Sequence, residues 1–206
     1  MSLTIDRIVE KYASPLWAAS PPDARQIERF RSDLVAQSRA DQITSYLSLF
    51  GSFERALPLF GSTFAEPPDV FWTVFLENWS ICDGFWSLRR DLLSTLRKRK
   101  AELSAIGSMK PADRDFYERV PECVPVFRGC TRRRVRGLSW TTDRERAEFF
   151  ARGGRFGTQA DLVIASAEIA KVDLFFVSTA RKEDEVVLDP YAIRRLRLGM
   201  PKALSD

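Results

Sequence analysis

Two glutamates stand two residues apart, directly before a short apolar run, in the segment Lys182-Glu183-Asp184-Glu185-Val186-Val187-Leu188-Asp189. Side chains in a strand alternate between faces, so Glu183 and Glu185 would point the same way and Asp184 the other. Solvated acids are common in turns, but Glu185 directly precedes the apolar run, which predicts that Glu185 lies at the start of a buried strand. A carboxylate there can stabilise the oxocarbenium-like centre that forms when a glycosidic carbon loses its leaving group.

Two further strand-like segments upstream carry polar side chains. Arg128 ends an apolar run, and its guanidinium could bind a phosphate or carboxylate through two parallel hydrogen bonds. Gly129 after it would allow a ligand close to the backbone; the alternative for Arg128 is an ion pair across a sheet edge. Ser139 and Thr141 are two residues apart, so both hydroxyls would share a face and could orient a carboxylate or a ribose, although threonine is also frequent in strands for structural reasons.

A glycine-rich segment, Gly153-Gly154-Arg155-Phe156-Gly157, separates the second and third motifs. Its backbone amides and Arg155 could bind a phosphate, and Phe156 offers a flat face for stacking. A plain connecting loop is the other interpretation. The chain contains no histidine, which excludes Ser-His and Cys-His nucleophile pairs and most zinc sites. Acid–base chemistry would therefore fall mainly to carboxylates, and we expect no metal site.

Composition predicts a folded protein inside a cell. Of 206 residues 45% are hydrophobic, which can supply a sizeable core, and the net charge of +4 suits an anionic ligand without requiring one. Cys82, Cys123 and Cys130 are odd in number and lack C-x-x-C spacing, which favours reduced thiols. The charged N-terminus lacks a signal-peptide pattern, and no apolar run is long enough to span a membrane. We expect a cytoplasmic protein, in its own cell or in a target cell after delivery.

The first half of the chain is predicted to be helical and the second half to be rich in strands. Helices are expected from Asp23 to about Phe50, from Pro67 toward Leu103 with Gly84 as a weak point, and over Pro111–Arg119. The aromatic stripe of Trp72, Trp79 and Trp86 in the second helix predicts core packing rather than a cofactor pocket. A further helix is expected over 143–150, and strands over 124–130, 135–141, 162–167, 172–177, 185–188 and near 193–198.

These motifs in this order resemble the R-S-E class of ADP-ribosyltransferases. That family has an aromatic-Arg-Gly strand, a Ser-x-Ser/Thr strand and a Glu-x-Glu strand, and the similarity extends over residues 124–198. The resemblance implies an α+β fold, with a helical N-terminal half followed by a split, mixed or antiparallel β-sheet core of ADP-ribosyltransferase type. It also implies a helical extension at 1–66 and a transferase domain at 67–206, with a helical wall at 67–120 and a β-core at 121–206.

The resemblance assigns roles to individual residues. Arg128 would hold the phosphate and ribose region of NAD, and the Gly129 backbone would bind the nicotinamide amide. Ser139 would position Glu185. Glu185 would bind the nicotinamide ribose and stabilise the cationic transition state. Thr141 would support the strand, although Ser-Trp-Thr here replaces the family's frequent Ser-Thr-Ser. The remaining assignments are looser: phosphate and nicotinamide contacts for Arg155 and Phe156, and activation of the acceptor by Glu183.

The implied activity is transfer of ADP-ribose from NAD, a co-substrate, to a macromolecular acceptor. An acid at Glu183 suits an arginine side chain as the acceptor, and a nucleic acid is the other possible acceptor class. Two alternatives remain: an NAD glycohydrolase on the same fold, and a non-catalytic nucleic-acid-binding module that uses the basic hairpin from Arg128 to Arg136. The family includes toxins, delivered effectors and phage proteins, so residues 1–66 could recognise a target or a partner protein such as an antitoxin. No membrane partner is expected.

Overall fold

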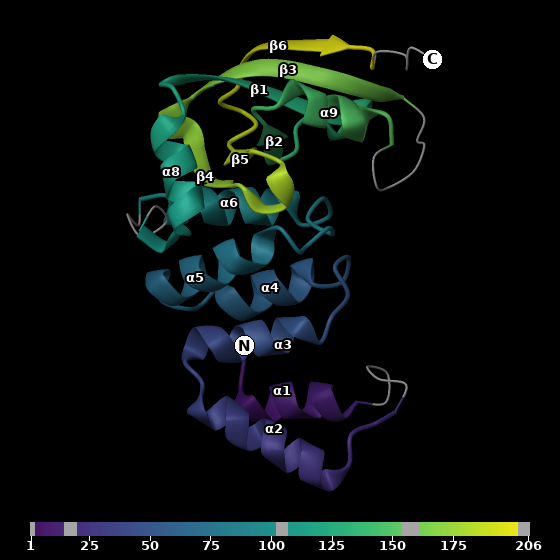
Figure 1. Cartoon of the computed structure of the whole chain (residues 1–206), viewed down its shortest axis with the longest axis vertical. Helices are drawn as coiled ribbons and strands as arrows, with labels where there is room; N and C mark the ends of the chain where they lie inside the picture. The colour runs from purple at the N-terminus through teal and green to yellow at the C-terminus, as the bar shows by residue number, and fades with distance from the viewer. Residues whose placement is uncertain (1–2, 15–19, 102–106, 154–160, 202–206) are drawn as a thin grey trace. The chain divides into compact units, whose positions relative to one another are not determined.

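The structure is a computed structural model that describes residues 3–14, 20–101, 107–153 and 161–201. The chain divides into two compact units, Met1–Thr95 and Leu96–Asp206, which we describe separately (Figure 1). The boundary between the units follows Thr95, whereas the expected boundary follows residue 66. The helix over Pro68–Trp79 and the start of the helix over Arg89–Arg99 therefore belong to the first unit. Within the described ranges no helix is both long enough and apolar enough to cross a membrane.

The first unit is helical. Its elements are α1 (Ile5–Ala13), α2 (Ala24–Ala36), α3 (Arg39–Ser48), α4 (Ala56–Thr63), α5 (Pro68–Trp79) and the first part of α6 (Arg89–Arg99). Local caps set several of these boundaries: Asp23 and Gln26 form a capping box at α2, and Pro68 occupies the first turn of α5. The stretch of helical spacing predicted over 23–50 forms two helices, α2 and α3, since Ser38 caps a new helix by accepting a hydrogen bond from the Asp41 amide.

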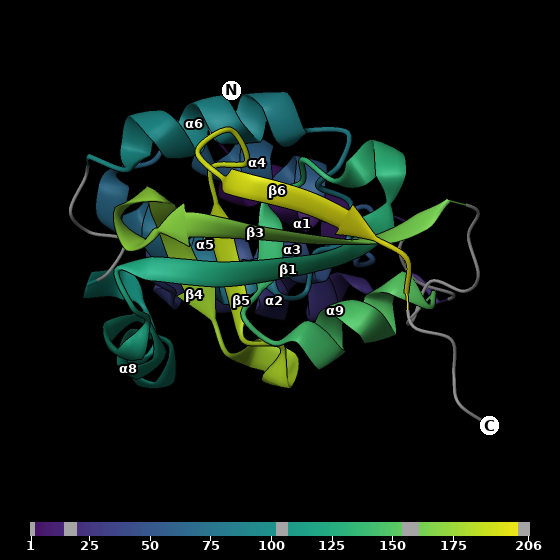
Figure 2. The ribbon, with the colours of Figure 1, turned by 90° about the horizontal axis from the view of Figure 1, so that it is seen from above.

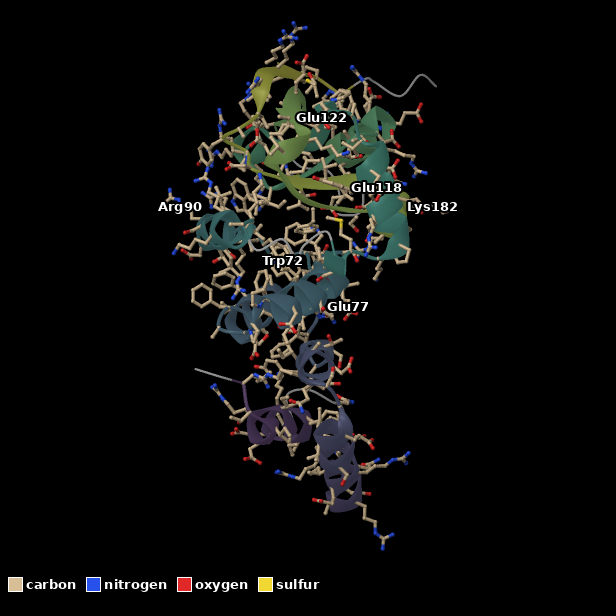
Figure 3. All side chains as sticks on the ribbon, turned by 90° about the vertical axis from the view of Figure 1, so that its left-hand side faces the viewer. Trp72, Glu77, Arg90, Glu118, Glu122 and Lys182 are labelled. Carbon is tan, nitrogen blue, oxygen red and sulfur yellow. The ribbon has the colours of Figure 1, made fainter. Side chains whose placement is uncertain are left out.

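Buried aromatic rings form the core of this unit. Trp72 and Trp79 are buried, as predicted, and Trp72 lies inside the unit while Glu77 is exposed (Figure 3). The helix expected to run past residue 100 is interrupted between α5 and α6, and Trp86 is half-buried in that connection. Gly84 lies in this interruption, and a Cβ there would stand 2.3 Å from the Phe53 carbonyl oxygen. The chain therefore approaches another backbone at this point.

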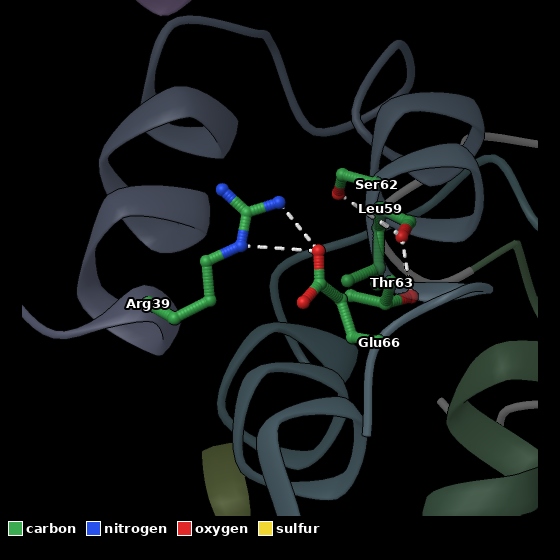
Figure 4. Close-up of polar contacts among 5 residues, drawn as sticks. All are labelled: Arg39, Leu59, Ser62, Thr63 and Glu66. Atoms are coloured by element: carbon green, nitrogen blue, oxygen red, sulfur yellow. Dashed lines mark hydrogen bonds and ion pairs between the residues drawn. The ribbon is translucent and has the colours of Figure 1, made fainter. Parts of the chain in front are cut away.

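An ion pair joins α3 to the segment before α5. Arg39 Nε donates to Glu66 Oε1 at 3.1 Å, and both side chains are largely buried (Figure 4). Next to it, Thr63 Oγ1 donates to the Leu59 carbonyl at 2.7 Å, which satisfies a buried hydroxyl at the end of α4. The pair gives Glu66 a structural role within the first unit.

The second unit is a six-stranded antiparallel sheet with flanking helices. Its elements are α8 (Pro111–Arg119), β1 (Cys123–Thr131), η1 (Arg132–Arg134), β2 (Ser139–Thr141), α9 (Arg144–Ala151), β3 (Leu162–Ala170), η3 (Lys171–Asp173), β4 (Leu174–Ser178), η4 (Ala180–Lys182), β5 (Glu185–Leu188) and β6 (Arg194–Gly199). The strand order is β4-β5-β2-β1-β3-β6, and β1, β3 and β6 run alongside one another in Figure 2. The expected α+β class, with helices mainly N-terminal, is confirmed.

The sheet changes character between β1 and β2. β1 pairs with β3 along its whole length, from Cys123↔Ala170 to Thr131↔Leu162. Among the described residues its pairing with β2 is recorded at one position, Phe127↔Thr141. The predicted strand over 135–141 is too long, because a 3₁₀ turn over Arg132–Arg134 and a turn closed by Gly137 N–H donating to the Arg134 carbonyl precede a short β2. The two strands therefore separate where the residues with candidate chemistry lie.

Candidate functional site

The three motifs come together on neighbouring strands. β1 carries Arg128 and Gly129, β2 carries Ser139 and Thr141, and β5 begins at Glu185. Since the sheet order places β2 between β1 and β5, segments up to 58 residues apart in the chain (127 to 185) become adjacent. Phe127 pairs with Thr141, and Thr141 pairs with Glu185, so these residues form a row across the sheet.

One face of this row carries hydroxyls around a carboxylate. Directly opposed residues in an antiparallel pair share a face, and Glu185 is opposed by Thr141 on β2 and by Ser178 on β4. Ser139 is two residues from Thr141 and therefore faces the same way. Glu185 is 9% exposed, which places its carboxylate in a largely desolvated position at the start of an apolar strand. The predicted strand over Glu185–Leu188 is confirmed.

The Thr141 side chain joins the end of β2 to the segment before β5 through hydrogen bonds. Its Oγ1 donates to the Glu183 carbonyl at 2.6 Å and accepts from the Asp143 amide at 2.9 Å. The Thr142 amide donates to the Asp184 carbonyl at 3.1 Å. Asp143 in turn caps α9, so the strand, the helix and the segment before Glu185 share one partly buried hydrogen-bond network.

Glu183 does not lie in the strand. β5 begins at Glu185, and Glu183 has helical backbone angles (φ −102°, ψ −7°), while Asp184 has a left-handed backbone at φ 42°. Strand alternation therefore does not govern the direction of Glu183, and the expected common face with Glu185 does not follow from the backbone. The structure joins Glu183 to the site through its carbonyl, which Thr141 binds.

The turn before Glu185 is strained and held at both ends. Arg181 and Lys182 have φ of 60° and 54°, in the left-handed region that disfavours residues with a Cβ. The carboxylate of Asp113 on α8 accepts from the Thr179 amide at 2.6 Å, and Arg146 on α9 donates to the Lys182 carbonyl at 3.0 Å. Backbone strain of this kind persists where the surroundings over-determine it, and it is frequent at functional sites.

Arg128 lies where β1 and β2 separate. Its Nε donates to the Arg134 carbonyl at 3.2 Å, and its Nη1 donates to the carbonyl of Ser139. Since Phe127 is paired with Thr141, alternation directs Arg128 to the face opposite Thr141. Gly137 makes room for the guanidinium, because a Cβ there would stand 2.5 Å from Arg128 Nη2. The structure thus brings Arg128 to the backbone of Ser139.

Gly129 has a packing role. A Cβ at this position would stand 2.0 Å from the Ala147 carbonyl oxygen and 2.4 Å from the Ala151 amide nitrogen, both in the backbone of α9. The absence of a side chain therefore lets α9 lie directly on β1. The predicted contact of the Gly129 backbone with a nicotinamide remains a prediction.

The remaining predicted residues differ in what can be said of them. Arg155 and Phe156 lie outside the described residues. Cys130, buried beside Arg128, has its thiol pKa raised by burial, against the opposing charge and hydrogen bond of Arg128. In the described ranges no group of three or more Cys, Asp or Glu side chains could hold a metal ion.

Sequence reasoning missed several residues around this site. Asp113 and Arg146 hold the turn before Glu185 from two different helices, and no local pattern connects them with it. Ser178 joins the Glu185 face only through the pairing of β4 with β5. Gly137 did carry a signal, since it lies two residues before Ser139 and follows a run of arginines.

Comparison of the chain with protein-family models, with curated proteins and with solved structures gave no match.

Proposed function

We propose that this chain is an NAD-dependent mono-ADP-ribosyltransferase, which breaks the bond between nicotinamide and ribose and passes ADP-ribose to a macromolecule. The observation that carries the proposal is the meeting of the three motifs on the adjacent strands β1, β2 and β5. Short motifs are weak evidence one at a time. Their meeting on neighbouring strands puts Ser139, Thr141 and Glu185 on one face of the sheet, and puts Arg128 on the other face where β1 and β2 separate.

Glu185 is the residue that would stabilise the reacting centre. When the carbon–nitrogen bond breaks, nicotinamide leaves with the electron pair, and the ribose C1 carries a positive charge as an oxocarbenium-like centre. A largely buried carboxylate opposes that charge more strongly than a solvated one, because little water screens it. The hydroxyls of Ser139 and Thr141 share its face and can fix its orientation or bind the ribose.

Arg128 would bind the diphosphate of NAD. Its guanidinium has five N–H donors, and the bonds to the Arg134 and Ser139 carbonyls use two of its nitrogens. These bonds hold the charged group at the separation of β1 and β2, next to Gly137. A phosphate there would form charge-assisted hydrogen bonds with the remaining donors.

Glu183 would serve the acceptor. It belongs to the strained turn ahead of β5 rather than to the strand, so its carboxylate can act on a second substrate that approaches outside the sheet. The acceptor nucleophile adds to C1 and gives up a proton, for which a carboxylate is a suitable base. An arginine side chain is one acceptor class that fits this role.

The test is incubation of the pure protein with labelled NAD and a cell lysate, with nicotinamide release measured in parallel. Glu185→Gln should lower both readouts by about 10²- to 10³-fold, in the range found for removing one group that stabilises transition-state charge. Glu168→Gln is the matched control, since Glu168 lies in the same sheet and its exposed pair with Arg195 contributes little. Equal labelling by wild type and Glu185→Gln would refute the proposal.

The same assay separates transfer from hydrolysis. A glycohydrolase would release nicotinamide without labelling any macromolecule, and Glu183→Ala would leave that release unchanged. A transferase that uses Glu183 for its acceptor would lose labelling in Glu183→Ala while retaining nicotinamide release.

A further inference from the structure

An exposed tyrosine ring lies beside two guanidinium groups in the second unit. Tyr191 stands in the connection between β5 and β6 and is 65% exposed. The Cζ atom of Arg136 lies 5.4 Å from the ring centroid, and that of Arg97 lies 5.6 Å from it. The three residues come from three separate segments: the end of α6, the β1–β2 connection and the β5–β6 connection. Tyr191 as a whole residue stays exposed to solvent despite these two neighbours.

The cluster is held in place by directed hydrogen bonds. Arg136 Nη1 donates to the Pro190 carbonyl at 2.7 Å. Arg97 binds both carboxylate oxygens of Asp189, at 2.7 and 2.9 Å, and the Tyr191 amide donates to the same carboxylate at 2.9 Å. The connection that carries the ring is therefore fixed to its neighbours. A fixed ring loses little conformational freedom when a ligand stacks on it.

The charge around the ring is positive. Asp189 neutralises Arg97, whereas Arg136 has no carboxylate partner in the part of the chain that the structure describes. Arg132 and Arg133 in the same connection are exposed and likewise lack a carboxylate partner among the described residues. The exposed Tyr191 ring next to Arg136 provides a stacking surface and a phosphate contact, and the exposed Arg132 and Arg133 of the same connection add further phosphate contacts.

We propose that Tyr191, Arg136 and the adjoining arginines bind single-stranded nucleic acid, with a base stacked on Tyr191 and the backbone phosphates on the arginines. An unpaired base is needed because the bases of a duplex are already stacked on one another. An acidic peptide could satisfy the charge, but it would not use the open ring. If the proposed transferase activity holds, this site supplies its macromolecular acceptor; the binding itself does not depend on that activity.

The experiment measures the fluorescence anisotropy of labelled single strands of about 16 nucleotides, one DNA and one RNA, with the full chain and without NAD. Three arginine–phosphate contacts predict that affinity falls about 20-fold between about 50 and 200 mM salt. Tyr191→Ala should weaken binding by about 5- to 150-fold, the loss of one stacked base, while Tyr191→Phe retains it. Arg136→Gln should reduce the salt dependence, and Arg29→Gln, an exposed arginine of α2, should change nothing.

Two results would overturn the proposal: unchanged affinity in Tyr191→Ala, or tighter binding of a duplex or an acidic peptide than of either single strand. Thermal unfolding of each variant shows whether it is folded, and the exposed Tyr191 should tolerate both substitutions. Glu185→Gln should bind single strands as the wild type does. Loss of transferase activity and loss of nucleic-acid binding are therefore separate outcomes.

Discussion

Substitution of Gly129 by alanine tests the contact on which the candidate site is built. The new Cβ would stand 2.0 Å from the Ala147 carbonyl oxygen and 2.4 Å from the Ala151 amide nitrogen. Neither atom can rotate away, because both belong to the backbone of α9. Since Cβ atoms essentially never approach other heavy atoms within 3.0 Å, the helix must move away from β1 by about 1 Å.

The expected cost follows from this displacement. Overpacking a close contact typically costs about 1–3 kcal/mol, and two backbone atoms are met at once here, so we expect about 3 kcal/mol. Ala147 and Ala151 are fully or almost fully buried, which leaves α9 little room to slide. For a unit of about 100 residues, a loss of this size lowers the midpoint of thermal unfolding by about 12–24 °C.

The assay is thermal unfolding followed by circular dichroism and calorimetry, with two glycine-to-alanine controls. At Gly199 on β6 and at Gly61 in α4 an added Cβ meets nothing within 4 Å. Gly199→Ala should therefore be close to neutral, and Gly61→Ala should stabilise its helix by about 0.5–1 kcal/mol. If Gly129→Ala unfolds at the same temperature as Gly199→Ala, α9 does not pack on β1 as described, and the packing reason for this glycine fails.

Three further predictions concern other contacts of the second unit. Thr141→Val should destabilise by about 1–3 kcal/mol in urea unfolding, since the Glu183 carbonyl and the Asp143 amide lose their partly buried hydrogen bonds to the Thr141 hydroxyl. A neutral result would contradict the network. Burial raises the pKa of the Asp189 carboxyl, but the hydrogen bonds from Arg97 and the Tyr191 amide and the positive charge of Arg97 lower it by more. The pKa of Asp189 therefore lies below its ordinary value. The stabilisation by the Asp189 carboxylate is then present above about pH 4 and is lost as the pH falls further. The destabilisation by Asp189→Asn, about 1 kcal/mol at pH 7, should therefore shrink as the pH is lowered below about 4. Iodoacetamide should modify exposed Cys123 and spare buried Cys130 until the protein unfolds, as mass spectrometry can show.

Local chemistry made several elements predictable. Pro111 opens α8, Asp143 caps α9, and the acid followed by Val-Val-Leu marks β5, because each signal depends on residues within a few positions of one another. The absence of histidine and the positions of Arg128, Ser139 and Glu185 likewise come from the sequence alone. These facts limit the chemistry that the chain can perform.

Errors arose where a particular hydrogen bond, local or distant, overrode the spacing pattern. The segment 23–50 has one helical period, but Ser38 caps a new helix. Glu183 and Glu185 have strand spacing, but Thr141 binds the Glu183 carbonyl and the strand starts after it. Each of these outcomes depends on which alternative hydrogen bond is available, and spacing by itself does not contain that information.

The sequence by itself determined which residues can do chemistry and, for the most part, which segments become helices and strands. Only the tertiary structure decided that β2 lies between β1 and β5, that the side of Gly129 without a Cβ faces α9, and that Tyr191 meets Arg136. The physical reason is that strand order and such contacts join residues tens of positions apart, through pairing and packing of the whole unit. No spacing rule reaches that far.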